Sequence, residues 1–239
     1  MAALNDSSRE RSSPITRFDL GSASVRDVNS ALHAPVLTGE FVVENPAGAH
    51  NVAVGMNADV AVTIVGHVGY YAAGMNQRAS IIIDGNAGTG VAENMMSGAV
   101  WVKGNASQSA GATAHGGLLT IDGNAAARCG ISMKGVDIVV GGDVGHMSAF
   151  MAQAGRLVIR GNAGDALGDS IYEARIYLRG EAASLGADCV AKEMRLEHHE
   201  ELGRLLKAAG YEDDDTHAYT RYGSARSLYH FHVDNAASY

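Results

Sequence analysis

The sequence is dominated by a glycine that returns every 19 residues. Seven glycines keep this spacing without insertion or deletion: Gly66, Gly85, Gly104, Gly123, Gly142, Gly161 and Gly180. Each one ends a short apolar segment and begins a turn, as in Leu157-Val-Ile-Arg-Gly-Asn-Ala. A strict period of this length is typical of structural repeats that stack along one axis and contact only their neighbours. The sequence therefore predicts a solenoid rather than a single globular core.

Aliphatic residues stand two and four positions before every one of these glycines. They are Ile64, Ile83, Val102, Ile121, Val140, Ile159 and Leu178 at the first position, and Val62, Ile81, Val100, Leu119, Ile138, Leu157 and Ile176 at the second. Alternate residues of a strand point to the same side, so both columns belong to the interior. A turn of 19 residues at about 3.3 Å per residue has a perimeter of roughly 60 Å, which suits a three-sided coil. We predict an all-β fold, a right-handed parallel β-helix of about seven coils.

Small or polar residues follow each glycine. Two positions later come Val68, Ala87, Ala106, Ala125, Val144, Ala163 and Ala182, and seven positions later come Ala73, Ala92, Gly111, Gly130, Ala149, Gly168 and Ala187. The residue directly after the glycine is Asn or Asp in five of the seven repeats. These side chains tolerate unusual turn dihedrals and can form hydrogen-bonded ladders. We interpret all three columns as structural.

The segments outside the repeats differ in character. Residues 1–17 are polar and aperiodic and are expected to be disordered. Residues 18–59 are strand-like in patches but do not follow the period, which indicates an N-terminal cap. We assign residues 60–190 to the β-helix and residues 191–239 to a C-terminal helix and strap.

The C-terminal region begins with an amphipathic pattern over Lys192–Ala209. An open solenoid end exposes unpaired strand edges, so we expect this helix to lie across that end. The tail from Tyr219 to Tyr239 is rich in Tyr, His and Arg and is expected to pack on a surface as a strap.

Charge and composition exclude several classes of protein. The formal net charge is −8 with both signs interspersed, which argues against nucleic-acid or anionic-membrane binding. No apolar stretch approaches the length of a membrane span and no signal-peptide pattern is present, so we expect a soluble, cytoplasmic protein. Cys129 and Cys189 stand about three coils apart, on the order of 14 Å, which is too far for a disulfide. Both are expected to be buried small hydrophobic residues.

One outward-facing column is unusually apolar. It lies between the two aliphatic columns and contains Thr63, Ile82, Trp101, Thr120, Val139, Val158 and Tyr177. A solvated face would be polar at these positions, and a contiguous apolar stripe indicates that something covers it. Either the N- or C-terminal segment of the chain lies over the stripe, or a separate protein partner docks on it through Ile82, Trp101, Val139, Val158 and Tyr177.

The turns of successive coils carry dissimilar polar and charged residues. Because coils stack in register, a set of them is expected to converge on one wall. The set comprises Arg78, Glu93, His115, Lys134, Tyr172 and Glu173. These residues would either form ion pairs between coils or line a partner surface, a ligand site or a tunnel.

Candidate catalytic and metal sites are weak. The pairs His198-His199 and His230-x-His232 lack a third spaced ligand, and the glycine-rich segment 85–90 lacks the lysine of a phosphate loop. Left-handed β-helix acyltransferases use a catalytic histidine, for which His115 or His146 would be candidates, but their hexapeptide repeat does not give a period of 19. Two cysteines are too few for an iron–sulfur cluster. We predict no catalytic, cofactor-binding or metal-binding residue in this chain.

Several longer motifs occur in order along the chain. They are Gly-Tyr-Tyr-Ala-Ala-Gly-Met-Asn-Gln-Arg (69–78), Ala-Glu-Asn-Met-Met-Ser-Gly (92–98), Gly-Ile-Ser-Met-Lys-Gly (130–135), Gly-His-Met-Ser-Ala-Phe-Met-Ala-Gln (145–153), Gly-Asp-Ser-Ile-Tyr-Glu-Ala-Arg (168–175) and the ending Tyr-Gly-Ser-Ala-Arg…Phe-His-Val-Asp-Asn (222–235). With these motifs, the chain from about Phe18 onward resembles the C-terminal GXGXG β-helix domain of glutamate synthase. It is most similar to the stand-alone form of that domain, which is the β-helical component of methylamine–glutamate N-methyltransferases (N-methylglutamate synthases).

The resemblance implies a non-catalytic structural subunit of a three-subunit complex. One partner would be similar to a class II glutamine amidotransferase, and the other to the synthase domain of glutamate synthase, which contains FMN and an iron–sulfur cluster. The complex would make N-methyl-L-glutamate from L-glutamate and methylamine with release of ammonia. The β-helix would brace both partners and help to wall the path of ammonia or methylamine. A more distant resemblance leaves open a scaffold of a formylmethanofuran-dehydrogenase-type one-carbon complex, and a glutamate synthase large-subunit module is a further alternative.

Overall fold

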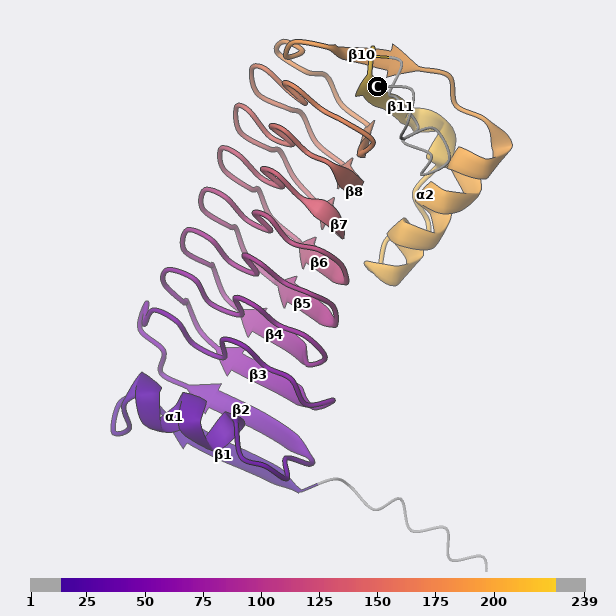
Figure 1. Cartoon of the computed structure of the whole chain (residues 1–239). Helices are drawn as coiled ribbons and strands as arrows, with labels where there is room; N and C mark the ends of the chain where they lie inside the picture. Colours follow the sequence, from indigo (N-terminus) through magenta and orange to yellow (C-terminus); the bar gives the residue numbers. More distant parts are fainter. Residues whose placement is uncertain (1–13, 227–239) are drawn as a thin grey trace, which may run out of the picture.

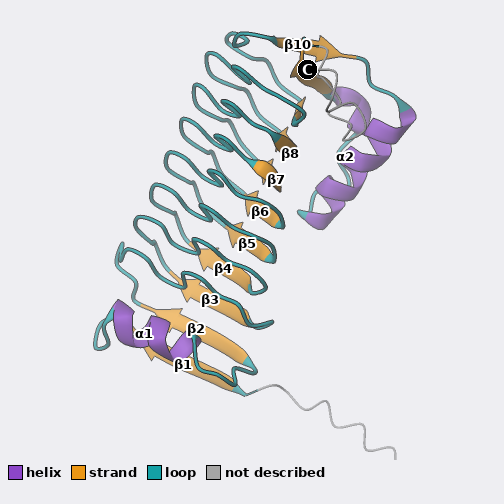
Figure 2. Ribbon diagram, viewed as in Figure 1, coloured by secondary structure: helices purple, strands orange, loops and turns teal. Residues whose placement is uncertain are grey.

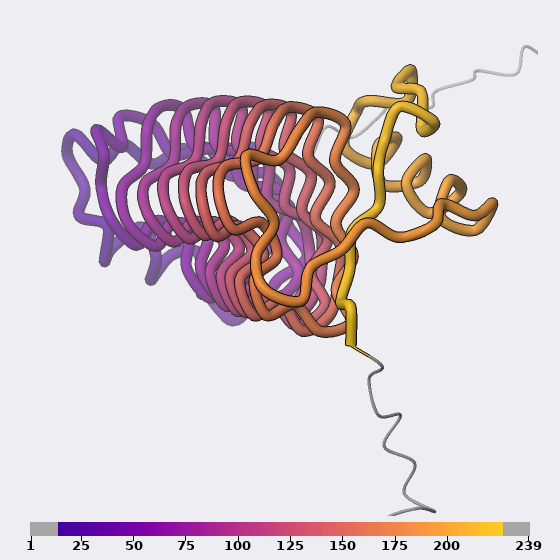
Figure 3. Tube along the Cα trace, turned by 90° about the horizontal axis from the view of Figure 1, so that it is seen from above, coloured from indigo at the N-terminus to yellow at the C-terminus, as the bar shows by residue number. Residues whose placement is uncertain are grey.

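The computed structural model describes residues 14–226, which form a stack of coils with one short strand per coil (Figures 1 and 2). The predictions for residues 1–13 and 227–239, including the His230-x-His232 pair, lie outside the described residues. Seen along the stack, successive coils superimpose and the C-terminal helix lies outside them (Figure 3). The structure confirms an all-β parallel solenoid of about seven turns.

A single parallel sheet runs along the whole stack. Its strands are β1 (Ile15–Asp19), β2 (Glu40–Glu44), β3 (Ala61–Val65), β4 (Ser80–Asp84), β5 (Ala99–Val102), β6 (Leu118–Ile121), β7 (Lys134–Val140), β8 (Ala154–Ile159) and β9 (Arg175–Leu178). From β3 to β9 residues pair with those 19 positions later, as Ile64 does with Ile83, except that Lys134 pairs with Ala154 beside a bulge at the start of β7. All fourteen residues of the two aliphatic columns are buried in the interior. The hydrophobic core is therefore a continuous column rather than a single centre.

The rest of each coil is a tight turn and not a second or third sheet. The small column that begins at Val68 forms only single parallel bridges from coil to coil. The column that begins at Ala73 holds a positive φ in six of its seven members, for example 55° at Ala92 and 57° at Ala149. Left-handed backbone disfavours large and branched side chains, which explains the alternation of Ala and Gly there. The expected three-sided coil is wrong in this respect: one side is a sheet and the remainder is stacked turns (Figure 2).

The repeated glycine is required because successive coils approach each other closely. A Cβ at Gly123 would lie 2.4 Å from Oδ1 of Asn105 and 2.9 Å from the carbonyl oxygen of Gly104. The Asn side chain occupies this space because its Oδ1 accepts a hydrogen bond from the backbone N–H of the next coil, at 2.8 Å from Asn124 to Asn105. The predicted ladder is confirmed. Most of its bonds join a backbone N–H to a side-chain oxygen, and one amide-to-amide bond, from Asn105 to Asn86 at 3.4 Å, accompanies them. The Asn and Asp members of this column from Asn86 to Asn162 do not have a positive φ, so turn dihedrals do not explain the column.

The N-terminal end is closed by β1 and by α1 (Val25–Leu32). Strand β1 pairs with β2 and extends the sheet, whereas Val28 and Leu32 of α1 enter the core. The side chain of Asn29 makes the hydrogen bonds that a further coil would otherwise make. Its amide N–H donates to the carbonyl oxygen of Asn51 at 2.7 Å, and its amide oxygen accepts from the N–H of Ala53 at 2.9 Å. The expected disorder up to residue 17 is thus wrong for 15–17, which form part of β1. Within the region 18–59 that was expected to be strand-like in patches, the segment around Val52 is a turn.

The C-terminal end is closed by strands, and the predicted position of the helix is wrong. Helix α2 (Leu196–Ala208) runs alongside the stack instead of across its end (Figure 1). Strand β11 (Thr220–Ser224) pairs antiparallel with β9, and β10 (Cys189–Lys192) pairs antiparallel with β11. The described part of the strap is therefore a strand of the sheet. A short 3-10 helix (Thr216–Ala218) connects α2 to β11.

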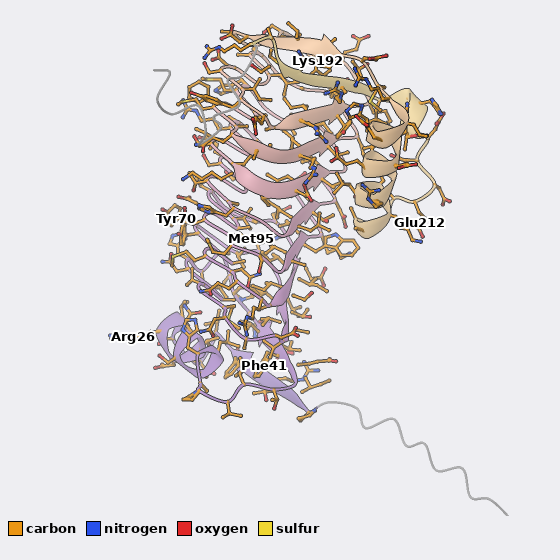
Figure 4. The ribbon with its side chains drawn as sticks, turned by 45° about the vertical axis from the view of Figure 1, so that its right-hand side comes forward. Arg26, Phe41, Tyr70, Met95, Lys192 and Glu212 are labelled. Carbon is orange, nitrogen blue, oxygen red and sulfur yellow. The ribbon has the colours of Figure 1, made fainter. Side chains whose placement is uncertain are left out.

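Both cysteines are free and buried, as predicted. Burial raises the pKa of the Cys129 thiol to about 12 and that of Cys189 to about 11. A thiol in such surroundings behaves as a small hydrophobic side chain. Figure 4 shows the same division of interior and exterior for two labelled residues: Met95 lies within the stack and Tyr70 at its outer edge.

Candidate functional site

The outward apolar column is half covered by the chain itself. Val139, Val158 and Tyr177 are fully buried beneath the C-terminal segment. That segment contributes Leu202, Leu206, Ala209 and Tyr219 to a small second core. For these strands, the structure decides between the two interpretations of the stripe, because the covering element is α2 and not a partner.

The junction between α2 and the sheet contains a buried carboxylate. Glu201 accepts hydrogen bonds from Arg156 at 2.8 Å and from Arg175 at 2.9 Å. Tyr177 donates its hydroxyl hydrogen to the same carboxylate. Burial raises the pKa of Glu201, but the three donors outweigh this effect and lower its pKa to about 2. Glu201 is therefore charged at neutral pH, and it anchors the middle of α2 to two adjacent coils.

A second ion pair anchors the segment that follows α2. Asp214 accepts two hydrogen bonds from Arg160, at 2.7 and 2.8 Å, and one from the hydroxyl of Tyr219 at 2.7 Å. Hydrogen bonding from Arg160 lowers the pKa of the Asp214 carboxyl. The guanidinium of Arg160 also stacks over the ring of Tyr211 at 3.9 Å. Arginine residues on the sheet thus meet acidic residues of the C-terminal segment on both sides of the covered column.

The covered region ends at Trp101 on β5. The indole N–H of Trp101 donates to Oδ1 of Asp122 at 2.7 Å, and the hydroxyl of Tyr211 donates to the same oxygen at 3.0 Å. The ammonium of Lys103 lies 3.1 Å from the centre of the indole ring, and a Cβ at Gly210 would lie 3.5 Å from the ring. The indole is thus held in one orientation at the C-terminal end of α2.

Beside Trp101 the sheet carries an apolar depression of about 260 Å³. Its lining includes Ile82 and Trp101 of the outward column, and Ala208 of α2 closes one side. The small residues Ser80 and Ala99 line the same depression. From here to β2, the outward column consists of half-buried residues that α2 does not cover. The partner-facing role predicted for Ile82 and Trp101 stays a prediction.

Three of the predicted polar residues lie in one column at a corner of the stack. His115, Lys134 and Tyr172 occupy the same position in their coils, and each donates its backbone N–H to the coil before it. Gln153 stands between Lys134 and Tyr172 in this column. All four side chains are exposed. The coil geometry therefore stacks these four positions at one corner, and the predicted surface for a partner or tunnel stays a prediction.

The remaining three predicted residues are placed differently. Glu173 is exposed and directly follows Tyr172. Arg78 is also exposed, and it occupies in its own coil the position that Glu173 occupies five coils later. Glu93 is not in this column: it stands three positions earlier in its coil, in the turn that begins at Gly90, where burial raises its pKa. Within residues 14–226, none of the six forms an ion pair.

A second depression of about 260 Å³, lined by Gly135 directly after Lys134, lies near the same corner. Its floor includes Gly135 and Gly155, where the chain enters the sheet, and its walls include Arg156, Glu173 and Arg175. At Gly155 an added Cβ would clash with the carbonyl oxygen of Val136, so the backbone itself forms the floor. Two of the wall residues are the arginines that hold Glu201. This corner is therefore polar, and it is connected to α2 through the hydrogen bonds of Arg156 and Arg175 with Glu201.

The histidine pair on α2 has a structural role. The ring of His198 accepts a hydrogen bond from the N–H of Arg195 at 3.0 Å and so caps the first turn of the helix. Burial, together with the nearby Arg221, lowers the pKa of His198. His199 forms a hydrogen bond with Thr216 at 3.1 Å. No cluster of three or more potential metal ligands occurs within the part of the chain that the structure describes.

None of the helices in residues 14–226 has the length and apolar character needed to cross a membrane.

The structure defines a parallel β-solenoid protein with two distinct surfaces. One is an apolar groove, formed by the depression beside Trp101 and Ile82, and the other is a polar corner, formed by the column from His115 to Tyr172 and the depression beside Glu173. No protein-family model matches the chain, and no solved structure matches it. Among curated proteins, the chain is similar to Protein GlxC of Rhizobium meliloti (strain 1021), with 56% identity over 56 residues. This stretch covers 23% of the chain and 25% of GlxC, so the match extends over a quarter of that protein. The name GlxC specifies no substrate or reaction.

Sequence reasoning missed the residues that fasten α2 to the sheet, above all Glu201 and Asp214. A signal was present in the sequence. Arg156 and Arg175 lie five positions before the repeated glycine, and Arg160 occupies the position directly before it. Arginines on both sides of a buried apolar column indicate an acidic covering segment, because unpaired charges at such an edge are costly.

Proposed function

We propose that this chain is the non-catalytic structural subunit of a glutamate-synthase-like complex. The complex makes N-methyl-L-glutamate from L-glutamate and methylamine with release of ammonia. In this proposal the chain bridges an amidotransferase-like subunit and a subunit that carries FMN and an iron–sulfur cluster. It also contributes to the wall of the path that ammonia or methylamine follows between them.

The observation that carries the proposal is a rigid stack with two different exposed surfaces. The apolar groove beside Trp101 lies on the outer face of the sheet, and the polar column from His115 to Tyr172 lies at a corner of the coils. Backbone hydrogen bonds connect every coil to the next and fix the spacing between these surfaces. A body of this kind suits the task of holding two partners at a set distance.

The chemistry of the two surfaces supports different roles. The groove at Ile82 and Trp101 is suited to a protein partner, since apolar area beside a fixed aromatic ring is typical of interface centres. The corner around Lys134 and Glu173 offers charged and hydrogen-bonding groups beside an open depression. Such groups suit the wall of a passage for a small polar amine. We assign the groove to docking and the corner to the passage or to the second partner.

The comparisons add support of a general kind. An identity of 56% over 56 residues relates the chain to GlxC over a quarter of its length. The motifs between Gly69 and Arg226 support the resemblance to the stand-alone GXGXG form, which is the source of the reaction named above.

Affinity purification from the native host tests the proposal. The tagged full-length chain should co-purify with one amidotransferase-like and one flavin-containing polypeptide, identified by mass spectrometry and by the FMN absorption spectrum. An untagged strain provides the control. Recovery of molybdopterin-containing partners instead would contradict the proposal and favour a one-carbon scaffold. Recovery of the chain alone, at native expression levels and low salt, would also contradict it.

A further inference from the structure

We propose that the uncovered half of the outward column, which runs over β2–β5, is the seat of a basic amphipathic helix from another polypeptide of the complex, lying end to end with α2. The inference rests on the proposed function in that it assumes a complex. It adds the position, the secondary structure and the charge of the partner element.

Continuity with the α2 interface is the first argument. The column that α2 covers at Val139, Val158 and Tyr177 continues without a break in register through Trp101, Ile82, Thr63 and Val42. Helix α2 runs down the stack from the level of β9 and ends beside Trp101 (Figure 1). The same kind of surface is thus covered by a helix in one half and exposed in the other.

The dimensions of the exposed half fit a second helix. The 13 residues of α2 give a length of about 20 Å at 1.5 Å per residue. The outer two of the four strands β2–β5 lie about 14 Å apart when neighbours lie about 4.8 Å apart, and the side chains of the outer strands add to this length. The small side chains of Ala61, Ser80 and Ala99 flank the exposed column and permit close approach of a backbone. A helix of three to four turns therefore fits the exposed half, as α2 fits the covered half.

The flanking charges specify the partner. Beside the covered column, Arg156 and Arg175 pair with Glu201, and Arg160 pairs with Asp214. Beside the exposed column, within the described residues, the charged side chains that form no ion pair are the acidic Glu40 and Asp84. The flanks there carry Glu40 on one side and Glu44, Asp84 and Lys103 on the other. Glu44 is paired with Arg17, and Lys103 lies 3.7 Å from Asp122. Electrostatic complementarity then favours lysine or arginine opposite Glu40 on one edge of the incoming helix and opposite Asp84 on the other.

The C-terminal end of α2 lies at the depression where the partner helix would meet it. Ala208 and Trp101 form part of the wall of the depression, and Asp122 fixes the indole through its hydrogen bond. A large apolar side chain at the end of the partner helix would fill the depression against Ile82. Because Asp122 already holds the indole of Trp101, Trp101 loses little side-chain entropy when the partner helix binds.

Site-specific photocrosslinking in the purified complex tests the inference. A benzoylphenylalanine replaces Thr63, in the middle of the exposed half, and a second sample carries it at the exposed Gln108 as a control. The expected result is a crosslink from position 63 to a helical segment of another polypeptide, with an apolar stripe edged by lysine or arginine. The control should not crosslink to that segment.

Several outcomes would overturn the inference. These are a crosslink from position 63 to residues 227–239 of the same chain, a crosslink to a second copy, or no crosslink in a complex that still assembles. The identity of the crosslinked protein separates this inference from the proposed function. If the helix belongs to a protein that is neither amidotransferase-like nor a flavoprotein, the docking site stands and the proposed function fails.

Two substitutions give a quantitative readout in the same complex. Ile82→Asp should weaken binding of the chain to its partners at least about tenfold, because it buries a charge in an apolar seat. Asp84→Lys should weaken it several-fold by reversing a flanking charge. Val36→Asp changes an apolar residue that is 84% exposed and should leave binding unchanged. Equal binding of the Ile82→Asp variant and the wild type, with both folded, would overturn the inference.

Discussion

Tyr177 on β9 and Glu201 on α2 face each other across the junction between the solenoid and its helix, and the tyrosine donates its hydroxyl hydrogen to the carboxylate. Arg156 and Arg175 complete the environment of that carboxylate. Because Tyr177 belongs to the outward column, this contact shows how the chain covers its own apolar surface. It also makes the attachment of α2 sensitive to the charge of one residue.

Replacing this carboxylate by an amide should loosen α2. We expect Glu201→Gln to lower the free energy of unfolding by about 1–2 kcal/mol, because two arginines that are partly exposed lose their charged partner. Trp101 is the only tryptophan of the chain and lies against the end of α2. Its fluorescence therefore reports directly on whether the helix is attached. Urea titration followed by this fluorescence provides the measurement.

The same contact predicts a dependence on pH. The pKa of Glu201 is lowered from 4.5 to about 2 in the folded chain. The stabilisation by Glu201 is therefore complete above pH 4.5 and is lost as the pH falls towards 2. Trp101 fluorescence should change in this window, and the change should be smaller in Glu201→Gln. Glu200→Gln, at an exposed neighbour, provides the control. An identical acid transition in all three proteins would show that Glu201 does not fasten α2.

The repeated glycine should tolerate no side chain. We expect Gly123→Ala to cost about 2–3 kcal/mol, because its Cβ would lie 2.4 Å from Oδ1 of Asn105. Gly48→Ala serves as a comparison: it meets no atom within 4 Å and has a φ of +77°, so only the backbone cost of about 1 kcal/mol applies. Adding Asn105→Ala to Gly123→Ala should recover part of the loss in a thermal unfolding experiment. A cost for Gly123→Ala no larger than that for Gly48→Ala would contradict the close approach of the coils.

Neither native thiol should react while the protein is folded. With a pKa of about 12 for Cys129 and about 11 for Cys189, almost no thiolate is present at pH 8. We expect no colour with Ellman's reagent until a denaturant is added, and then two thiols per chain. A Gln108→Cys variant, with an exposed thiol, should react at once. Native reaction of either cysteine at the rate of this control would rule out the buried positions.

The polar corner should affect the complex without affecting the fold. Lys134 is exposed, and Lys134→Ala should change the free energy of unfolding by less than about 0.5 kcal/mol. Under the proposed function it should lower N-methylglutamate formation by the assembled complex several-fold. Lys207→Ala, a matched change on the exposed face of α2, should leave the rate unchanged. Equal rates for the two variants would remove Lys134 from the proposed passage.

The repeat itself could be predicted from the sequence, because each position of the coil occurs in seven successive repeats and its residues can be compared. The burial of Ile83 and the register of the strands follow from period-2 alternation and from the constant spacing. The close approach at Gly123 and the hydrogen bond that Asn105 accepts from the N–H of Asn124 could also be predicted. These features depend on neighbours in the stack, and the neighbours of every coil are known once the period is known.

The two ends of the chain could not be predicted in the same way. The amphipathic pattern of α2 shows which face is apolar but not what that face covers, and it fits the open end as well as the outer face. The pairing of Tyr222 with Ile176 joins positions 46 residues apart in sequence and follows no period. Asn29 imitates a coil through one side chain, which no pattern of hydropathy reveals. Each of these contacts joins one pair of segments that are distant in sequence and occurs only once, so no repeated pattern reveals it.

Reconstitution of the complex with and without this chain decides whether the chain is a structural subunit that the reaction needs. Under the proposed function, the amidotransferase-like and flavin-containing subunits of the proposed complex are combined with glutamate and methylamine, and N-methyl-L-glutamate is quantified by mass spectrometry. We predict no product from this chain alone, a low rate from the two partners, and a large increase when the chain is added. Full activity of the partners without it, or turnover by the isolated chain, would contradict this role.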